Sequence, residues 1–316
     1  MVDAPFLPSE EGRFDERPGL GYLMVAVAAT LFAVNGTVSK VVLGSGLSSL
    51  ELTQIRSTGA AAGFLVFLLL FARARLRVDR RELLFLVVFG ITGVAFVQWL
   101  YFVAIDHMPV GIALLIQFTG PLLVALFARF VYHEQIRRRI WVALAFCITG
   151  LGVIVEVWSG VAFSAVGITA ALGAAVALAT YILMAERERR HRDPASLSLY
   201  GFLFAAIFWA IVQPLWQFPW RALDDNVSLQ GNLSEHTAPV WLHVSFVVII
   251  GTMVTFSLLT GALRHIPATR ASIVATLEPV LATVVAWVWL DESFGTAQLA
   301  GGSIVLAGIV LAQTAR

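Results

Sequence analysis

Residues 104–134 read AIDHMPVGIALLIQFTGPLLVALFARFVYHE, and residues 262–292, ALRHIPATRASIVATLEPVLATVVAWVWLDE, repeat the pattern. The two stretches align without a gap when one is shifted by 158 positions (265 − 107 for their histidines). The matches include residue types that set these stretches apart from ordinary apolar helices, namely His107 with His265, Pro109 with Pro267, Pro121 with Pro279, and Glu134 with Glu292. We therefore infer that the chain contains a duplicated unit.

The composition places this unit in a membrane. Of the 316 residues, 59% are hydrophobic and only 13% are charged, whereas soluble domains are about 25% charged. Ten apolar segments approach or exceed the ~20 residues that cross a bilayer as a helix, at about 20–43, 50–71, 82–105, 109–131, 139–157, 166–185, 196–216, 240–262, 269–290 and 297–314. Their long unbroken apolar runs argue against a β-barrel, whose strands alternate. The sequence thus predicts an all-α integral membrane protein with ten transmembrane helices.

The two copies are expected to face opposite ways. A first repeat at 20–158 and a second at 159–316 would hold five helices each, and an odd number inverts the second copy. Lys and Arg support this, because cytoplasmic loops are enriched in them. With the N-terminus inside, all 21 fall on cytoplasmic loops or tails except Lys40, Arg56 and Arg221. Both termini are therefore predicted to be cytoplasmic, with a disordered tail at 1–19 and the loop 217–239 outside.

An inverted repeat is typical of secondary transporters, and the motifs resemble one family. Pro121 and Glu134 are followed by TGLG (149–152), and Pro279 and Glu292 are followed by LAGI (306–309). In these features the chain resembles the drug/metabolite transporter superfamily, EamA type, over residues 20–314. The string ALLIQFTGPLLVALF is also similar to the fourth helix of threonine/homoserine-exporter-like members. The first half departs from the second at one position, with Gly120 where the second half has Glu278.

Four prolines are candidate kinks or hinges. Pro109 and Pro267 are expected to begin helices 4 and 9, where a missing N–H costs little. Pro121 and Pro279 are expected within those helices, where each frees a backbone carbonyl. Lipid does not tolerate such a carbonyl, but a wet cavity or neighbouring protein does. We expect helices 4 and 9 to line a central cavity that helices 1, 3, 6 and 8 complete; the alternative is a kink that serves packing alone.

Glu278 is the most informative candidate for substrate binding. At 1.5 Å per residue it lies ~14 Å deep, and an ionisable group at that depth is a functional candidate by default. It could bind a substrate amine or exchange protons, or tie two helices by hydrogen bonds. Gln117, one turn before Pro121, could offer a donor and an acceptor to a zwitterion, or bond to a neighbouring helix.

Further polar and aromatic residues are predicted to line the cavity, with helix packing or an interfacial aromatic belt as the alternative: Asn35, Gln98, Trp99, Tyr101 and Tyr181. Arg56 has three readings, since it could snorkel to the surface, pair with Glu51 or meet a substrate carboxylate. Lys40 is expected to snorkel. Glu134 and Glu292 are expected to tie helix ends to their neighbours.

The sequence as a whole predicts a secondary active transporter in the cytoplasmic (inner) membrane that works by alternating access. The resemblance implies export of small, amino-acid-like metabolites, with proton exchange left open. A solute channel is the first alternative, although no repeated selectivity filter is present. An intramembrane enzyme is the second, although H-E-x-x-H and G-x-S-x-G are missing, and no Walker A motif signals an ATP-driven pump.

The expected partners are a small-molecule substrate and the lipid bilayer. No cofactor, catalytic residue, nucleic acid or metal is expected, since Cys147 is the single cysteine and His107 and His265 should lie on opposite membrane faces. The small residues of GAAAG (59–63) permit close helix contact. We expect this contact within one chain, which favours a monomer, with a dimer seam as the alternative.

Overall fold

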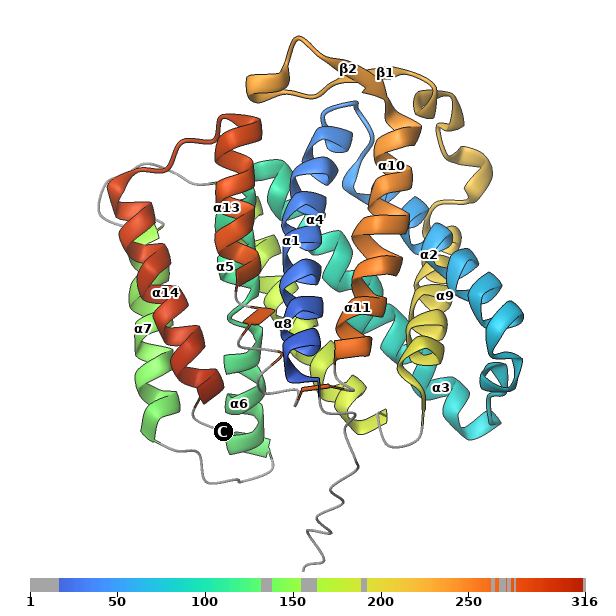
Figure 1. Cartoon of the computed structure of the whole chain (residues 1–316), viewed down its shortest axis with the longest axis horizontal. Helices are drawn as coiled ribbons and strands as arrows, with labels where there is room; N and C mark the ends of the chain where they lie inside the picture. The colour runs from blue at the N-terminus through green and yellow to red at the C-terminus, as the bar shows by residue number, and fades with distance from the viewer. Residues whose placement is uncertain are drawn as a thin grey trace, which may run out of the picture.

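A computed structural model of the chain describes residues 17–131, 138–154, 164–188, 192–262, 265–266, 271, 274–275 and 277–314 (Figure 1). Helices dominate it. They are α1 Pro18–Leu43, α2 Ser49–Phe71, α3 Arg80–Val88, α4 Phe96–His107, α5 Val110–Gln117, α6 Gly120–Val131, α7 Arg138–Ile154, α8 Ala165–Glu188, α9 Pro194–Val212, α10 Val240–Val248, α11 Thr255–Ala262, α13 Leu277–Leu290 and α14 Thr296–Thr314.

Six helical spans are long and apolar enough to cross a membrane, namely Pro18–Leu43, Ser49–Phe71, Glu82–His107, Ala165–Ala185, Ala195–Val212 and Val240–Leu259. Shorter apolar helices lie at Val110–Val124, Leu277–Leu290 and Thr296–Leu311. The predicted all-α membrane class is confirmed, and the count of ten stays a prediction. Most of the tail, residues 1–16, and the expected repeat boundary at 158/159 lie outside the described residues. Helix α1 begins at Pro18, a residue that suits the first helical position.

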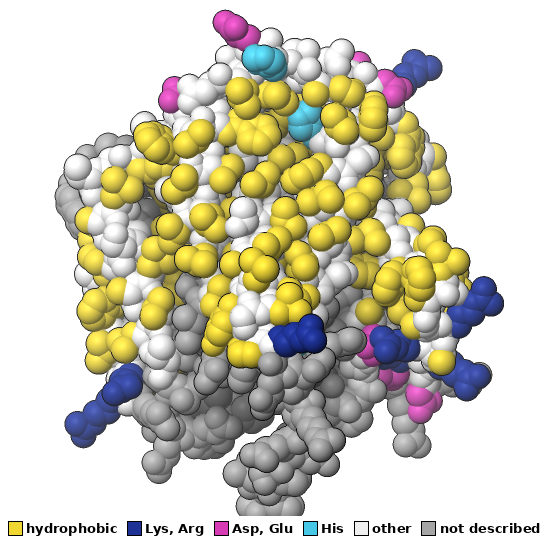
Figure 2. All heavy atoms as spheres, in the orientation of Figure 1, with side chains coloured by type: hydrophobic (Ala, Val, Ile, Leu, Met, Phe, Trp, Pro, Cys, Tyr) yellow, Lys and Arg dark blue, Asp and Glu magenta, His cyan; other side chains and the backbone are white. Residues whose placement is uncertain are grey.

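Figure 2 shows a broad hydrophobic surface between two polar rims, with most Lys and Arg side chains of this face along the lower rim. The apolar surface includes exposed large residues such as Leu70, Phe71 and Ile211. Exposure of many large apolar side chains would be unfavourable in water. In a bilayer the same surface faces lipid, so the pattern agrees with a membrane protein.

The helices of the two halves pack reciprocally. Helices α7 and α14 lie side by side and run in opposite directions (Figure 1). A Cβ on Gly150 would lie 2.7 Å from the Gly301 carbonyl oxygen, and a Cβ on Gly308 would lie 2.9 Å from the Ala143 carbonyl oxygen. The repeat relates the two contacts to each other, because Gly150 corresponds to Gly308 (150 + 158) and Gly301 corresponds to Ala143 (301 − 158). Such a two-fold contact between antiparallel helices is what an inverted duplication produces.

The third and eighth apolar segments each contain a π-helical stretch, Phe89–Ala95 and Ile249–Val254. Gly93 of the first packs against the Tyr181 backbone of α8, and Gly251 of the second packs against the Asn35 side chain of α1. The glycines are 158 positions apart (251 − 93), and their partners are 146 apart (181 − 35). The structure therefore relates α1 to α8 by 146 positions. Single-turn π-bulges are frequent at functional sites.

The fourth apolar segment is interrupted. Helix α5 ends at Gln117 and α6 begins at Gly120, with a turn between them. Pro121 is the second residue of α6, a position where its missing N–H is tolerated. Pro109 directly precedes α5 and Pro279 lies in the first turn of α13. Pro267 lies outside the described residues. The expected interior kink at Pro121 is therefore a change from one helix to another, and the role of these prolines as hinges stays a prediction.

The long loop between α9 and α10 has structure of its own. Strands β1 Asn226–Ser228 and β2 Thr237–Pro239 form an antiparallel hairpin in which Val227 faces Ala238. The loop bonds to the end of α13, where Trp289 Nε1 donates to the Leu229 carbonyl at 2.8 Å and Asn232 Nδ2 donates to the Val288 carbonyl at 3.0 Å. The hairpin is the exception to an otherwise helical fold.

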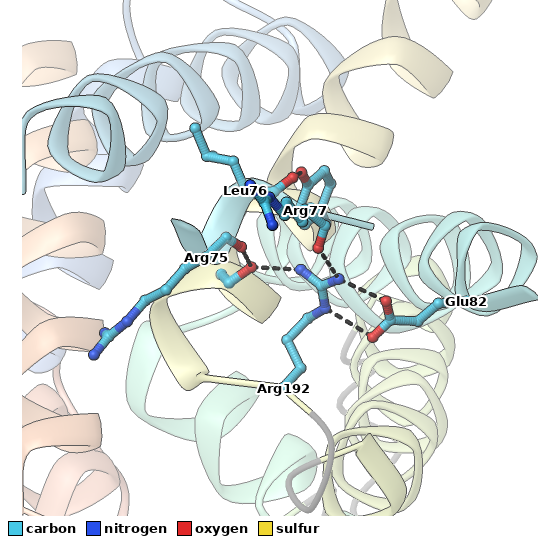
Figure 3. A network of polar contacts seen from close by, with 7 residues as sticks. Arg75, Leu76, Arg77, Glu82 and Arg192 are labelled. Carbon is cyan, nitrogen blue, oxygen red and sulfur yellow. Dashed lines mark hydrogen bonds and ion pairs between the residues drawn. The ribbon is translucent and has the colours of Figure 1, made fainter. Parts of the chain in front are cut away.

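At the opposite end, a polar network ties the loop after α2 to the start of α9 (Figure 3). The buried Arg192 donates two hydrogen bonds to the Glu82 carboxylate, at 2.9 and 2.6 Å. It also donates to Ser196 Oγ at 2.6 Å and to the Arg77 carbonyl at 2.9 Å. Ser196 Oγ in turn donates to the Arg75 carbonyl at 2.7 Å. A guanidinium with this many partners fixes the loop firmly, because each charge-assisted bond is stronger than a neutral one.

Candidate substrate cavity

A cavity of about 350 Å³ lies between helices of both halves. It is lined by Phe32, Asn35, Arg56, Phe89, Gly93, Val94, Val97, Gln98, Tyr101, Leu114, Gln117, Phe118, Leu178, Tyr181, Ser198, Phe202, Phe256, Leu259 and Glu278. All seven residues predicted to bind substrate are in this set except Trp99. Six of the contributing segments are those expected from the sequence: α1, the segment Phe89–Ala95 with α4, then α5, α8, α11 and α13. Two further helices, α2 and α9, also contribute, and the sequence does not indicate them as cavity helices.

Trp99 lies elsewhere, in an aromatic cluster. Its ring centroid is 5.7 Å from that of Trp209 and 6.2 Å from that of Phe96. Gln98 and Tyr101 are three residues apart and share one face of α4. Trp99 directly follows Gln98 and therefore points about 100° away from it around the helix axis. Helix geometry therefore places Gln98 and Tyr101 at the cavity and Trp99 in the packing core.

Arg56 is the main lining residue that was not assigned to the site. It is only 5% exposed, so it does not snorkel. Its Nε donates to Thr252 Oγ1 at 2.8 Å, and its guanidinium carbon lies 5.4 Å from the centroid of the Phe102 ring. Glu51 is occupied elsewhere, since it caps α2 through Ser48. Two of the three readings of Arg56 are therefore wrong, and contact with a substrate remains.

Three amide oxygens at the cavity have no hydrogen-bond partner within the part of the chain that the structure describes: Asn35 Oδ1, Gln98 Oε1 and Gln117 Oε1. The orientation of Gln98 is set by its Nε2, which donates to the Val94 carbonyl at 3.2 Å. Buried polar atoms are nearly always paired. These side chains line the cavity, and N–H or O–H groups of a solute would complement their oxygens.

Aromatic residues form much of the remaining lining. Phe256 packs edge-on against both Phe32 and Phe202, each at 5.6 Å between centroids, and Phe89 stacks on Tyr181 at 5.2 Å. Phe32 is three residues before Asn35 in α1, nearer to the end of the helix that lies away from the hairpin. The cavity thus has a polar part and an aromatic part, which is the usual composition of a small-molecule site.

The hairpin end of the bundle is closed by an ion pair, which we call the outer ion pair. Lys40 Nζ lies 2.6 Å from Glu292 Oε1 and donates to the Met108 carbonyl at 3.1 Å. Glu292 Oε2 accepts from the Val110 N–H at 3.2 Å. Lys40 therefore does not merely snorkel, and Glu292 ties helix ends together as expected. Glu134, its counterpart, lies outside the described residues.

The two histidine turns have reciprocal contacts. A Cβ on Gly167 would lie 3.2 Å from His107 Cβ, and a Cβ on Gly21 would lie 3.0 Å from His265 Cβ. Each turn therefore packs on the first helix of the other half. Among the described residues, no group of three or more His, Cys, Asp or Glu is placed to hold a metal ion.

Comparison with known proteins identifies the family. The model of the EamA-like transporter family matches the chain twice, at residues 19–156 and 165–314. The chain belongs to the EamA-like transporter family. It is thereby a member of the drug/metabolite transporter superfamily, as the duplicated motifs suggested.

Individual EamA relatives are named as exporters. The chain is 30% identical over 258 residues to the threonine/homoserine exporter RhtA of Escherichia coli, which covers 81% of this chain and 80% of the relative. It is 25% identical over 295 residues to the pseudopaline exporter CntI of Pseudomonas aeruginosa, which covers 93% and 96%. A solved crystal structure superposes with a TM-score of 0.59 over 92% of this chain and 96% of the other; its 21% identity shows the fold alone.

Proposed function

We propose that this EamA-family chain is a secondary transporter that exports small amino-acid-like solutes by alternating access. One observation carries the proposal: a single central cavity is built from both halves and brings a buried cation, a carboxylate and unpaired amide oxygens together (Arg56, Glu278, Asn35, Gln98 and Gln117). Intramembrane charges of this kind mark substrate or ion pathways. The threonine/homoserine and pseudopaline exporters among its relatives support the direction and the solute class.

The mechanism rests on the two ends of the bundle. We propose that the described conformation is closed on the outside, because the outer ion pair joins α1, α5 and the end of α13 there. The reciprocal contacts of α7 with α14 would let the two halves rock about their common axis. Solute would enter from the arginine-rich end and leave at the hairpin end.

The same reasoning gives the setting of the transporter. We propose the inner membrane with both termini cytoplasmic, because the Lys and Arg side chains gather at one rim. A monomer is proposed, since the GAAAG face of α2 is used within the chain. A Cβ on Gly59 would lie 2.8 Å from Val248 Cγ1, and one on Gly63 would meet Met253. Proton exchange at Glu278 would supply the driving force.

Flux measurements on purified protein in liposomes test the proposal. We expect saturable uptake of labelled threonine or homoserine, accelerated when unlabelled solute is loaded on the opposite side. Flux that rises linearly with concentration and shows no counterflow would indicate a channel and contradict the proposal. Chemical conversion of the solute would indicate an enzyme.

A further inference from the structure

The guanidinium of Arg56 is held in one orientation and left open at its outer end. Thr252 Oγ1 accepts from Arg56 Nε and donates to the Val247 carbonyl at 2.8 Å, within the wide turn of the π-helical stretch. In the described part of the chain no carboxylate lies within 4.0 Å of Arg56. An unpaired buried charge is costly, and a guanidinium fork suits a carboxylate, which it can bind through two parallel bonds.

Glu278 offers the opposite charge to the same cavity. It lies in the first turn of α13 and lines the cavity, and no described residue forms a hydrogen bond or ion pair with its carboxylate. The side chains of Asn35, Gln98 and Gln117 line the same cavity, and their oxygens have no hydrogen-bond partner among the described residues. A group with several N–H donors and no acceptor would satisfy such a set, and an ammonium is that group.

The two charges belong to one site. Arg56 and Glu278 line the same cavity, yet they do not form an ion pair with each other. The space between the two charges is part of a cavity with room for a small solute, and its aromatic part can receive an apolar or hydroxylated side chain. A solute with only one charge would leave the other protein charge buried and unpaired.

We propose that the cavity recognises both ends of a zwitterion, with Arg56 binding the carboxylate and Glu278 binding the ammonium of a free α-amino acid. Asn35, Gln98 and Gln117 supply further acceptors to the ammonium. Thr252 is a positioning residue that holds Arg56. This inference rests on the proposed function and deepens it, because it assigns each end of the solute to a side chain.

Two threonine analogues separate the two ends. Threoninol keeps the ammonium and lacks the carboxylate, whereas 2,3-dihydroxybutyrate keeps the carboxylate and has a hydroxyl in place of the ammonium. Inhibition constants against labelled threonine are measured in liposomes. For the unaltered protein each analogue should bind at least about tenfold more weakly than threonine, since a hydrogen bond to a charged group is worth roughly a factor of ten or more.

Each variant should lose affinity only for the end of the solute that the replaced side chain binds. Glu278→Gln should weaken the binding of threonine by about tenfold or more and leave the binding of 2,3-dihydroxybutyrate unchanged. Arg56→Gln should weaken threonine and leave threoninol unchanged, and Thr252→Val should do the same to a lesser degree. Ser303→Ala, an exposed residue of α14 that is not part of the cavity lining, should change none of the three constants.

The analogue that a variant still binds shows that its cavity is intact. If a glutamine variant fails to fold, Glu278→Asp and Arg56→Lys provide the same test. Each should weaken threonine binding less than the glutamine variant does, and should leave the binding of the same analogue unchanged. The inference is overturned if a variant weakens the binding of threonine and of both analogues by the same factor. It is also overturned if Glu278→Gln keeps its threonine affinity and loses only accumulation driven by a pH gradient, because Glu278 then exchanges protons without binding the solute.

The proposed function fails separately from this inference. If the unaltered protein binds no amino acid in liposomes, the proposed export of amino-acid-like solutes is wrong and the inference falls with it. If the unaltered protein exchanges threonine but accepts both analogues equally well, only the assignment of Arg56 and Glu278 is wrong.

Discussion

Replacing Lys40 by methionine should make the cavity accessible from the outside. Lys40 joins α1 to Glu292, and Glu292 in turn accepts from the Val110 N–H at the start of α5. Under the proposed alternating access, these helix ends separate once per cycle. In that mechanism the ion pair is made only in the outward-closed state, so its removal destabilises that state relative to the outward-open one.

The size of the effect follows from the partial burial of the pair. The Lys40 and Glu292 side chains are 24% and 10% exposed. Losing one partner costs about 3–5 kcal/mol for a fully buried pair and about 0–1 kcal/mol for an exposed one. For this intermediate case we expect about 1–2 kcal/mol, which is a shift of about 5–30-fold toward the outward-open state.

A single reporter cysteine measures this shift. Cys147, the one native cysteine, is first replaced by alanine, and Leu114 of the cavity lining is replaced by cysteine. A membrane-impermeant thiol reagent added outside should then label Leu114→Cys about 5–30 times faster in Lys40→Met. Arg221→Met is the matched control, because it removes an exposed charge from the same end. Equal labelling of the two variants would refute the reasoning, as would slower labelling in Lys40→Met.

Three further predictions concern packing. Gly150→Leu should lower the free energy of unfolding by about 1–3 kcal/mol, because the larger side chain overpacks the contact with α14. Gly152→Leu is the control and should not change this free energy, since a Cβ at Gly152 meets nothing within 4 Å. Thermal unfolding in detergent measures both variants, and equal midpoints would contradict the α7–α14 contact. Gly251→Val should abolish transport by displacing Asn35, and transport at the unaltered rate would argue against this close approach. Arg192→Gln should free the loop Arg73–Arg77 and speed its cleavage by trypsin, with Arg138→Gln as the control; an unchanged cleavage rate would show that the network of Figure 3 does not hold the loop.

The sequence predicted the class of fold and the family because both depend on patterns that the chain repeats. Apolar length is a direct requirement of the bilayer, and the alignment of His107 with His265 is visible without any structure. The π-helical stretches could not be foreseen in this way. They add a residue to one turn, and the residues of Ile249–Val254 have no composition that distinguishes them from an ordinary apolar helix.

The candidate site was predicted in part for a similar reason. Glu278 and Gln117 stand out because a polar residue in a membrane segment is costly. Arg56 is as costly, but it lies near a helix end where snorkelling is the cheaper alternative, and only its burial in the folded structure excludes that reading. Trp99 was misplaced because sequence proximity to Gln98 does not mean a shared helix face.

The duplication also explains why the cavity has a polar part and an aromatic part. Residues related by the repeat line it in pairs: Arg56 with Phe202 (202 − 56 = 146), Gln98 with Phe256 and Tyr101 with Leu259 (both 158 apart). In these three pairs the first half supplies the polar residue and the second half the apolar one, whereas Phe32 and Leu178 are both apolar and Asn35 and Tyr181 both carry a polar group (both pairs 146 apart). Because the halves are inverted, equivalent positions lie toward opposite ends of the cavity. Substitutions in one copy therefore give the cavity a direction, and Glu278, which replaces the glycine found at Gly120, adds the one carboxylate from the second copy to the polar part.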